Sequence, residues 1–297
     1  MNKKMKINTL KLFIIHYSLF IIAAVLLQLP SPAAAQEANT LLQLPADNVK
    51  EAQQGRPTIH ATLIGVGGVH QLDTYLSPLE YHGPQGHFMH ETLRRTHWAD
   101  GRISVQTLWH GNFAYTKNAT EKGVNLGGDI RFDAAWRYSL RNQSSSSPFR
   151  LLIGPQIGTT VGALYSTRNG NNPVQAIASV HLSASAIAFY NFRLWRQPFT
   201  ARYQLDVPLI GAKFSPNYGQ SYYEIFSLGH YDHNVCVTHP FNAFSSRHLL
   251  TIDVPLPITT LRFGYLCDLR QSKVNELKYH NYSHAFMIGI VRYLTIK

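Results

Sequence analysis

The stretch 199–209 alternates between two kinds of side chain, and this alternation limits the folds that the chain can adopt. Its odd-numbered residues, from Phe199 to Leu209, are apolar, and its even-numbered residues are polar or proline. Because successive side chains of a strand point to opposite faces of a sheet, this pattern predicts a β-strand with one apolar face. Similar alternation recurs in other segments, among them 102–116, 126–141 and 149–165. The chain is therefore expected to be all-β.

The amino-terminal residues predict export from the cytoplasm. Lysines precede an apolar run over 12–29, which ends in the small residues Ala33-Ala-Ala35. A basic start, an apolar middle and small residues at the cleavage position form a secretory signal, and the cleavage position disfavours the alternative of a retained membrane helix. We expect a signal peptide at 1–35, a periplasmic leader at 36–56 and an outer-membrane β-barrel at 57–297.

The composition favours a surface that faces lipid. Charged residues are 14% of the chain and aromatic residues 12%, which is an unusual balance for a soluble secreted protein with many exposed strand faces. The arginines alternate with acids and form no basic stripe, so no nucleic-acid partner is expected. Cys236 and Cys267 are too few for a disulfide framework. One bridge stays open as an alternative, but the place of Cys267 on an apolar row favours a free thiol.

About ten strands are predicted. If the chain starts in the periplasm, the longer connections fall on the outer side and the short turns on the periplasmic side, as in outer-membrane barrels with an even number of strands. We therefore expect an antiparallel up-and-down transmembrane β-barrel with one long outer loop, 211–245. A further hairpin within that loop would make twelve strands. The other longer loops are expected at 72–81, 117–123, 166–173 and 269–282.

Aromatic residues gather at the two ends of the predicted strands. Aromatic rings favour the headgroup level of a bilayer, so two such girdles are typical of a membrane barrel. A soluble β-sandwich or lipocalin-like barrel also alternates, but strands longer than the about 9–11 residues needed to span a bilayer favour the membrane. The periplasmic girdle is expected to contain Phe149, Phe199, Trp136, Tyr138, Tyr190, Phe192 and Tyr293, and the outer girdle Phe113, Tyr115, Tyr165 and Phe286.

Charged residues occupy the rows that face the barrel interior. Buried charges are costly unless they are paired, and a barrel of ten or twelve strands is narrow enough for side chains to fill. We therefore expect a neutralising charge network, and the alternative is the selectivity lining of a small pore. The predicted network consists of Arg102, Asp129, Arg131, Asp133, Arg137, Arg202, Asp206, Arg262 and Asp268.

The outer loops carry the candidate ligand-binding residues. The aromatic-rich loop 214–234 is expected either to fold into the mouth as a lid or to pack on its own aromatic rings. The spacing of His230 and His233 matches no recognised zinc pattern, and no nucleophile motif surrounds Ser221 or Ser283, so neither a metal nor a cofactor is expected. The candidate residues are Arg168, Asn169, Asn171, Tyr222, Tyr223, Glu224, His230, Asp232, His233, His280 and His284.

Three of these stretches, 72–81, 167–173 and 218–233, resemble an uncharacterised family of Bacteroidetes outer-membrane proteins. The resemblance covers most of the mature chain and implies a place in the outer membrane, but no activity. A fainter similarity to outer-membrane phospholipase A rests on Asn169-Gly170. Ser166 and Arg168 stand where that enzyme's motif has histidine and serine, so lipid hydrolysis through this motif is not expected.

Three functions remain for such a chain. The first is a non-enzymatic outer-membrane barrel with a plugged or narrow lumen, whose outer loops bind a surface partner, a glycan or lipopolysaccharide. The second is a hydrolase or acyltransferase that acts on lipid of the outer leaflet, because His, Asp, Ser and Tyr gather in the outer loops. The third is a small diffusion channel, which the inward charges would line. Outer-membrane lipid is the expected surrounding partner in each case.

Overall fold

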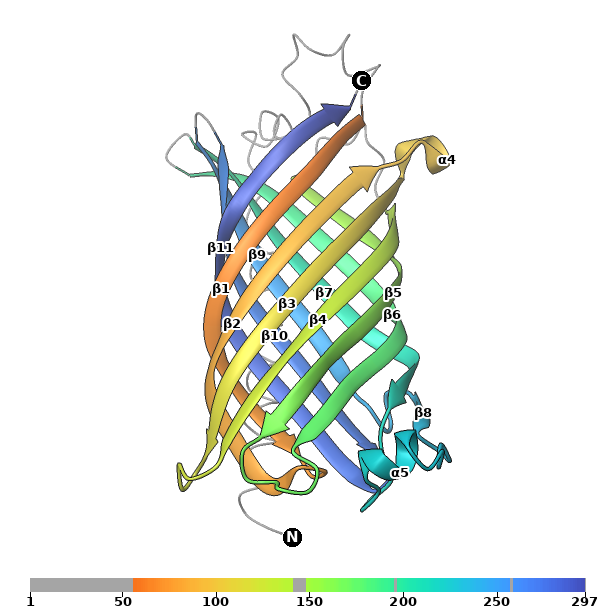
Figure 1. Ribbon diagram of the computed structural model, residues 1–297. Helices are drawn as coiled ribbons and strands as arrows, with labels where there is room; N and C mark the ends of the chain where they lie inside the picture. The colour runs from red at the N-terminus through yellow and green to blue at the C-terminus, as the bar shows by residue number, and fades with distance from the viewer. Residues whose placement is uncertain (1–55, 141–147, 195–196, 257–258, 297) are drawn as a thin grey trace.

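The chain folds into a closed antiparallel barrel of ten strands (Figure 1). The computed structural model describes residues 56–140, 148–194, 197–256 and 259–296, so the predicted signal peptide and nearly all of the leader lie outside the described residues. Neighbouring strands pair in sequence order, and β1 closes the barrel against β11. The ten strands are β1 (Arg56–Asp73), β2 (Ser77–Arg95), β3 (Ile103–Asn118), β4 (Val124–Ser139), β5 (Phe149–Ser166), β6 (Val174–Leu194), β7 (Gln197–Phe214), β9 (Ser245–Pro255), β10 (Thr260–Val274) and β11 (Leu277–Ile296).

The long connection adds no strand pair that would make a barrel of twelve. It contains α5 (Tyr222–Phe226) and β8 (Val235–Thr238). β8 is four residues long and pairs only with the last residues of β7, from Gly211 to Phe214. The predicted loop 211–245 therefore begins inside a strand, and the barrel keeps ten strands.

Two of the predicted outer loops are strands instead. The chain turns only at residues 74–76 between β1 and β2, and at 275–276 between β10 and β11. β1 has 18 residues; at about 3.3 Å per residue and a tilt of about 40° it rises roughly 45 Å, whereas the apolar band of such barrels is about 25 Å tall. The outer ends of the strands thus stand above the bilayer, where polar residues are tolerated on both faces. This explains why 72–81 and 269–282 look like loops in the sequence.

The chain makes a tight turn at Ala99-Asp100-Gly101 between β2 and β3. This turn lies within the short helical element α4 (Trp98–Gly101), at the same end of the barrel as the carboxyl terminus (Figure 1). Ala99, Asp100 and Gly101 all have positive φ angles of 52°, 55° and 77°, which is the conformation that tight hairpin turns require. Among the described residues, no helix is both long enough and apolar enough to span a bilayer.

Apolar side chains cover the outer wall of the barrel. Trp136, Tyr138 and Tyr293 are exposed near the periplasmic ends of their strands, and Phe113, Tyr115 and Tyr165 are exposed farther out. Phe113 is the eleventh residue of β3, and Phe286 is the eleventh residue of β11 counted back from its end. Eleven residues rise about 28 Å at a tilt of about 40°, close to the bilayer thickness. Phe113 and Phe286 of the outer girdle therefore lie about one bilayer thickness above the periplasmic ends of their strands.

The interior contains an apolar core as well as charges, which the sequence pattern did not predict. The core lies between the inward faces of the strands and includes Leu63 and Met89, which are fully buried. In β1 the inward row is apolar from Ile59 to Val69, and the outward row of the same stretch carries His60 and Thr62. The other core residues are Ile59, Ala61, Leu93, Leu108, Leu152, Ile187, Phe189, Leu249, Leu266, Ala285, Met287 and Val291.

Candidate functional site

Twelve charged side chains form a network across the lumen. The six arginines and six acids give this network no net formal charge, and each of them takes part in at least one ion pair within 4.0 Å. The inward rows of five strands, β2, β4, β7, β9 and β10, supply them. The members are Glu91, Asp129, Arg131, Asp133, Arg137, Arg202, Asp206, Arg247, Asp253, Arg262, Asp268 and Arg270.

Glu91 is the acid that joins two of the arginines. Its Oε2 accepts hydrogen bonds from Arg202, at 2.6 Å, and from Arg262, at 2.9 Å. Arg262 also donates to both oxygens of Asp253, at 2.6 and 2.8 Å. All of these side chains are buried. Buried ion pairs with this geometry are costly to break, because the remaining charge cannot be hydrated.

The structure places eight of the nine predicted lumen charges in this network. Arg102 does not belong to it: it follows the α4 turn at the end of the barrel and donates to Tyr138 Oη at 2.8 Å. The prediction for Arg102 was therefore wrong, because it assigned this turn residue to a strand. Four members were missed, namely Glu91, Arg247, Asp253 and Arg270. The alternation of β2 and β9 could have indicated the first three, whereas Arg270 lies in a stretch that was predicted to be a loop.

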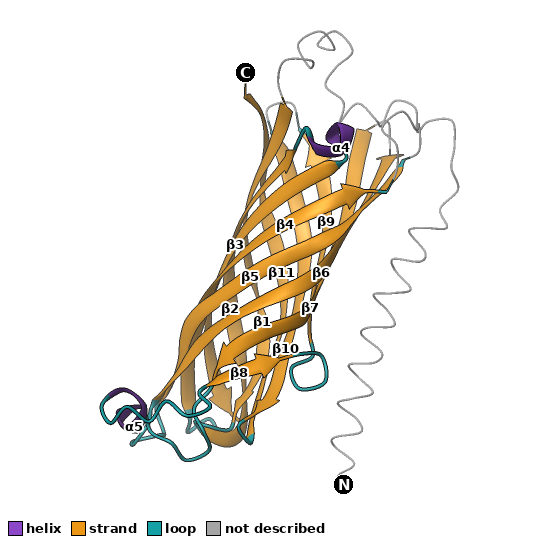
Figure 2. Cartoon of the chain, turned by 90° about the vertical axis from the view of Figure 1, so that its right-hand side faces the viewer, coloured by secondary structure: helices purple, strands orange, loops and turns teal. Residues whose placement is uncertain are grey.

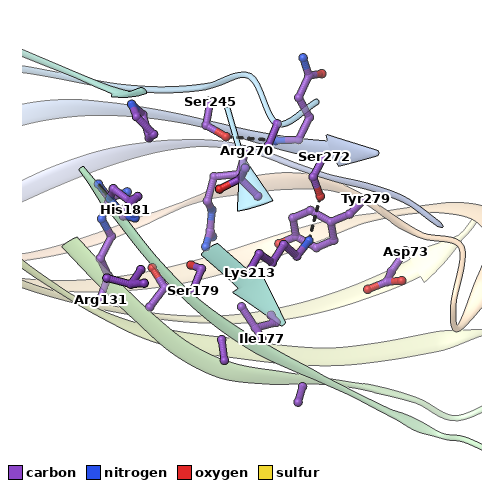
Figure 3. Close-up of a pocket in the computed structure, with 18 of the residues that line it drawn as sticks. Asp73, Arg131, Ile177, Ser179, His181, Lys213, Ser245, Arg270, Ser272 and Tyr279 are labelled. Atoms are coloured by element: carbon purple, nitrogen blue, oxygen red, sulfur yellow. Dashed lines mark hydrogen bonds between the residues drawn. The ribbon is translucent and has the colours of Figure 1, made fainter. Parts of the chain in front are cut away.

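A cavity of about 110 Å³ lies in the lumen at the outer end of the network. Arg131, Ser179 and His181 line it from β4 and β6, and Arg270, Ser272 and Tyr279 line it from β10 and β11 (Figure 3). Typical small-molecule pockets have roughly 300–1,000 Å³, so this cavity has room for a small polar group only. None of the eleven candidate residues of the outer loops lines it.

Lys213 is the cation of this cavity that has no directly paired acid. Its Nζ donates to Ser272 Oγ at 2.8 Å and lies 4.1 Å from the centre of the Tyr279 ring. It forms no ion pair with any described carboxylate. Figure 3 shows its side chain extending along the cavity toward Tyr279. Lys213 lies near the end of β7, in a stretch that was predicted to be a loop, so the sequence pattern did not single it out.

Asp73 is the acid of the same cavity that has no directly paired cation. It is buried at the end of β1, and its Oδ1 accepts a hydrogen bond from the Tyr75 backbone N–H at 3.0 Å. Within the described chain, no lysine, arginine or histidine nitrogen forms an ion pair with it. Asp73 and Lys213 therefore place opposite charges on one cavity, where they attract each other without forming a direct ion pair within 4.0 Å.

Arg270 adds a free hydrogen-bond donor to the lining. Its Nη1 donates to Asp129 Oδ2 at 2.9 Å, while its buried Nε donates no hydrogen bond to any described residue and lies 3.6 Å from Asp268. A buried N–H without a hydrogen-bond acceptor costs free energy. The Nε group can therefore donate to a ligand oxygen.

The long connection crosses the mouth of the barrel. Tyr222 of α5 donates to Gln175 Oε1 at 3.0 Å and accepts from the Ala176 backbone N–H at 2.7 Å. On other hairpins, Tyr75 donates to the Gln220 carbonyl, and Asn275 donates to the carbonyls of Ser215 and His233. The segment from 215 to 234 is thus anchored to three other hairpins, at the end of the barrel opposite α4 (Figure 2).

The structure does not bring the eleven candidate loop residues together. Glu224 caps α5 through Ser221, while His230, Asp232 and His233 are exposed at the tip of the loop. Asn169 donates to the Leu76 carbonyl at 3.3 Å, and Arg168, Asn171 and Tyr223 are exposed. His280 and His284 lie on the outward face of β11, where they stack on Tyr282 and Tyr265.

The outward wall carries a different group of polar side chains. His248 Nε2 lies 3.2 Å from Ser246 Oγ, and its Nδ1 lies 2.7 Å from Tyr203 Oη. All three side chains belong to the outward rows of β9 and β7, opposite the row of Arg247. With the imidazole proton on Nδ1, Ser246 donates to His248 and His248 donates to Tyr203. A hydroxyl, a base and a group that orients the base are thereby aligned.

The solved structures similar to this chain include outer-membrane barrels. The translocator domain of the autotransporter NalP from Neisseria meningitidis is 10% identical, with a TM-score of 0.38 and coverage of 87% of this chain and 99% of that domain. The transport unit of the autotransporter AIDA-I from Escherichia coli is 9% identical, with a TM-score of 0.39 and coverage of 88% and 99%. An outer-membrane channel from Pseudomonas putida F1 is 9% identical, with a TM-score of 0.33 and coverage of 81% and 96%.

No curated protein sequence matches the chain. The family model described as "Protein of unknown function (DUF3316)" matches residues 17–296. This match covers the whole barrel, from β1 to β11. The expectation of an uncharacterised family of outer-membrane β-barrels is thereby confirmed, and the chain belongs to the DUF3316 family.

Proposed function

We propose that this outer-membrane barrel does not conduct and that it binds a small zwitterionic group in the cavity at the outer end of its lumen. The observation that carries the proposal is the pair of opposite charges on that cavity, Lys213 and Asp73, neither of which has an ion-pair partner within the described chain. A ligand with an oxyanion and an ammonium group would supply both partners. The oxygens of the oxyanion, for example a phosphate, would accept hydrogen bonds from Lys213, Ser272 and Arg270 Nε. The ammonium group would lie beside Asp73.

The filled interior supports the absence of conduction. The charge network and the apolar core are both buried inside the barrel. Arg137, for example, is fully buried and donates to Gln156 and Ser185. An aqueous pore would leave such side chains hydrated. Single-channel recordings in planar bilayers should therefore show no steady conductance, and a reproducible open level would contradict the proposal.

Phosphoethanolamine is the probe for the cavity. Isothermal titration calorimetry of the full barrel in nanodiscs should detect binding, and Lys213→Met should weaken it at least tenfold, because a desolvated charge-assisted hydrogen bond contributes about 1.5–3 kcal/mol. Asp73→Asn keeps the oxygen that accepts from Tyr75 and should also weaken binding. Lys273→Met, on the exposed outward row of β10, is the matched control. Equal affinity in all four proteins would refute the proposal.

Lipid hydrolysis is a second candidate function, and Ser246, His248 and Tyr203 are the specific observation in its favour. Ser246 is the tenth residue of β9 counted from its periplasmic end, and His248 is the eighth, so both face the outer half of the bilayer. His248 would be the base in this group, in place of the histidines that the sequence offered for a lipid hydrolase, among them His230 and His284. Ser246→Ala should abolish the release of fatty acid from phospholipid by the purified barrel, whereas Ser227→Ala should not. Absence of release by the unchanged protein would dismiss this candidate.

We also retain the proposal made from the sequence that the outer loops bind a glycan, lipopolysaccharide or another surface partner. Tyr218, Tyr223 and Tyr231 expose 72%, 66% and 64% of their surface. Exposed aromatic rings at this level suit contact with sugar faces or lipid headgroups. Replacement of all three by serine should abolish adhesion to lipopolysaccharide-coated surfaces, and unchanged adhesion would argue against a binding role for these rings.

A further inference from the structure

The wall of the barrel is interrupted beside the cavity. β7 pairs with β9 from Thr200 to Asp206 and with β8 from Gly211 to Phe214. Between these two stretches, Val207, Pro208 and Ile210 pair with β6, and Leu209 is skipped at a register shift. On the other side, none of residues 207–210 pairs with a described strand. The ladder that closes the barrel is therefore open over four residues of β7.

The cavity reaches this interruption. Four of its lining residues border it: Pro208 on β7, Thr238 at the end of β8, and Ala243 and Ser245 at the start of β9. The same cavity contains Lys213, Arg270 and Asp73 in the lumen. The lining of one cavity thus extends from the charged interior to the border of the interruption.

The interruption lies at the level of the outer girdle. Val207, where it begins, is the eleventh residue of β7. Phe113 and Phe286 of the outer girdle are likewise the eleventh residues of their strands, counted from the periplasmic side. The opening is therefore at the depth of the headgroups of the outer leaflet.

The surface around the opening is apolar. Phe241, in the turn between β8 and β9, exposes 97% of its surface, and Val237 of β8 exposes 63%. On β7, Ile210 exposes 55%. A group of exposed apolar side chains of this size marks a surface that contacts lipid or a ligand.

We propose that the ligand of the cavity is an amphiphile that enters sideways from the outer leaflet, with its zwitterionic headgroup inside the wall and its alkyl chain left in the bilayer. This inference rests on the function proposed above and specifies the class of ligand. The size of the cavity supports it: about 110 Å³ is a few times the roughly 30 Å³ that a water molecule occupies, so it can admit a headgroup but not an acyl chain.

The probe is lysophosphatidylethanolamine with a photoreactive diazirine on its acyl chain close to the glycerol ester, so that the label stays at the depth of the opening. It is added to the full barrel in nanodiscs, irradiated, and the labelled peptides are identified by mass spectrometry. We expect label on the turn 239–244 and on β8, and we expect Lys213→Met to reduce it at least fivefold. Lys273→Met should leave the labelling unchanged, which controls for lipid that touches the wall nonspecifically.

A block of the opening tests the route. Ala243→Trp places a large ring at the border of the interruption, and Ala163→Trp, on the exposed outward row of β5, is the matched control. Only the first should abolish the Lys213-dependent labelling. Native-like mobility of both variants in unheated gel electrophoresis confirms that they fold.

Two results would overturn the inference in different ways. If phosphoethanolamine binds through Lys213 but the acyl probe labels the wall independently of Lys213, the cavity takes a free soluble ligand and the sideways route is wrong. If neither compound depends on Lys213, the proposed function fails as well. Labelling that survives Ala243→Trp at full strength would also exclude this route.

Discussion

Glu91→Gln tests whether the lumen network is desolvated, because Glu91 supplies the only carboxylate that Arg202 contacts within the described chain. The substitution keeps the shape of the side chain and removes its charge. Arg262 retains both oxygens of Asp253, at 2.6 and 2.8 Å. Arg202 retains the side-chain carbonyl of Gln204, at 2.6 Å, and its position over the Phe189 ring, but no carboxylate. The change thus leaves one buried guanidinium without a counter-ion.

The expected loss of stability follows from that single unpaired charge. Breaking a buried pair by removing one partner costs about 3–5 kcal/mol. Because the new amide oxygen still accepts a hydrogen bond, the lower end, about 3 kcal/mol, is expected. Urea titration of the barrel in detergent, followed by tryptophan fluorescence, gives the free energy of unfolding by linear extrapolation.

Two further variants show whether the loss comes from the charge. Glu80→Gln changes an exposed acid on the same strand and should stay within about 0.5 kcal/mol of the unchanged protein. The double change of Glu91→Leu with Arg202→Met removes the pair together and should recover part of the loss, because apolar replacement of a whole buried pair is often neutral. If Glu91→Gln cost less than about 1 kcal/mol, the lumen would be hydrated and the pore hypothesis would regain support.

Three further predictions concern the apolar core, the segment 215–234 and the thiols. Leu266→Ala should cost about 2–5 kcal/mol in the same urea titration, because Leu266 is fully buried in the apolar core. Hydrogen bonds from the backbone N–H and hydroxyl of Ser221 lower the pKa of Glu224. This stabilisation is present at neutral pH and is lost as the pH falls through that lowered pKa, so limited proteolysis of 215–234 should accelerate in acid, and Ser221→Ala should be cleaved several-fold faster at neutral pH. Maleimide should label the partly exposed Cys236 in the folded barrel and the buried Cys267 only after unfolding, because both thiols are free; a single disulfide by mass spectrometry would contradict this.

The bilayer-spanning part of the fold was predictable because lipid imposes a strict alternation there. Residues such as Ile130 and Val161 must be apolar on the outside, and this requirement leaves a period of two in the sequence. Above the bilayer the requirement ends. The outer ends of β1 and β11 carry His70, Tyr279 and His280 on strands without a clear apolar row, so the sequence pattern could not distinguish them from loops.

The cavity was not predictable for a related reason. Lys213 and Asp73 come from the outer ends of two strands that are far apart in the sequence, and they meet on one cavity only because the barrel closes. The charge network was easier to predict, since Arg131 and Asp133 alternate within one regular strand. Its apolar neighbours were not, because Leu63 and Met89 face inward on rows whose outward partners include His60 and His90. Periodicity distinguishes the two faces of a strand, but it does not show which face is apolar toward lipid and which lines the interior.

The alternating stretch 199–209 also contains Pro208, at which the regular strand pairing of β7 ends. Proline has no N–H to donate, and within sheets it is confined to edges, strand starts and bulges. Pro208 lies in the interruption, and the register between β6 and β7 shifts next to it, between Leu182 and Ser183. A strand that must pair on both sides to close a barrel would not be expected to carry proline there. The same stretch that predicts the barrel therefore also encodes the opening in its wall, and with it the place where a lipid headgroup can reach Lys213.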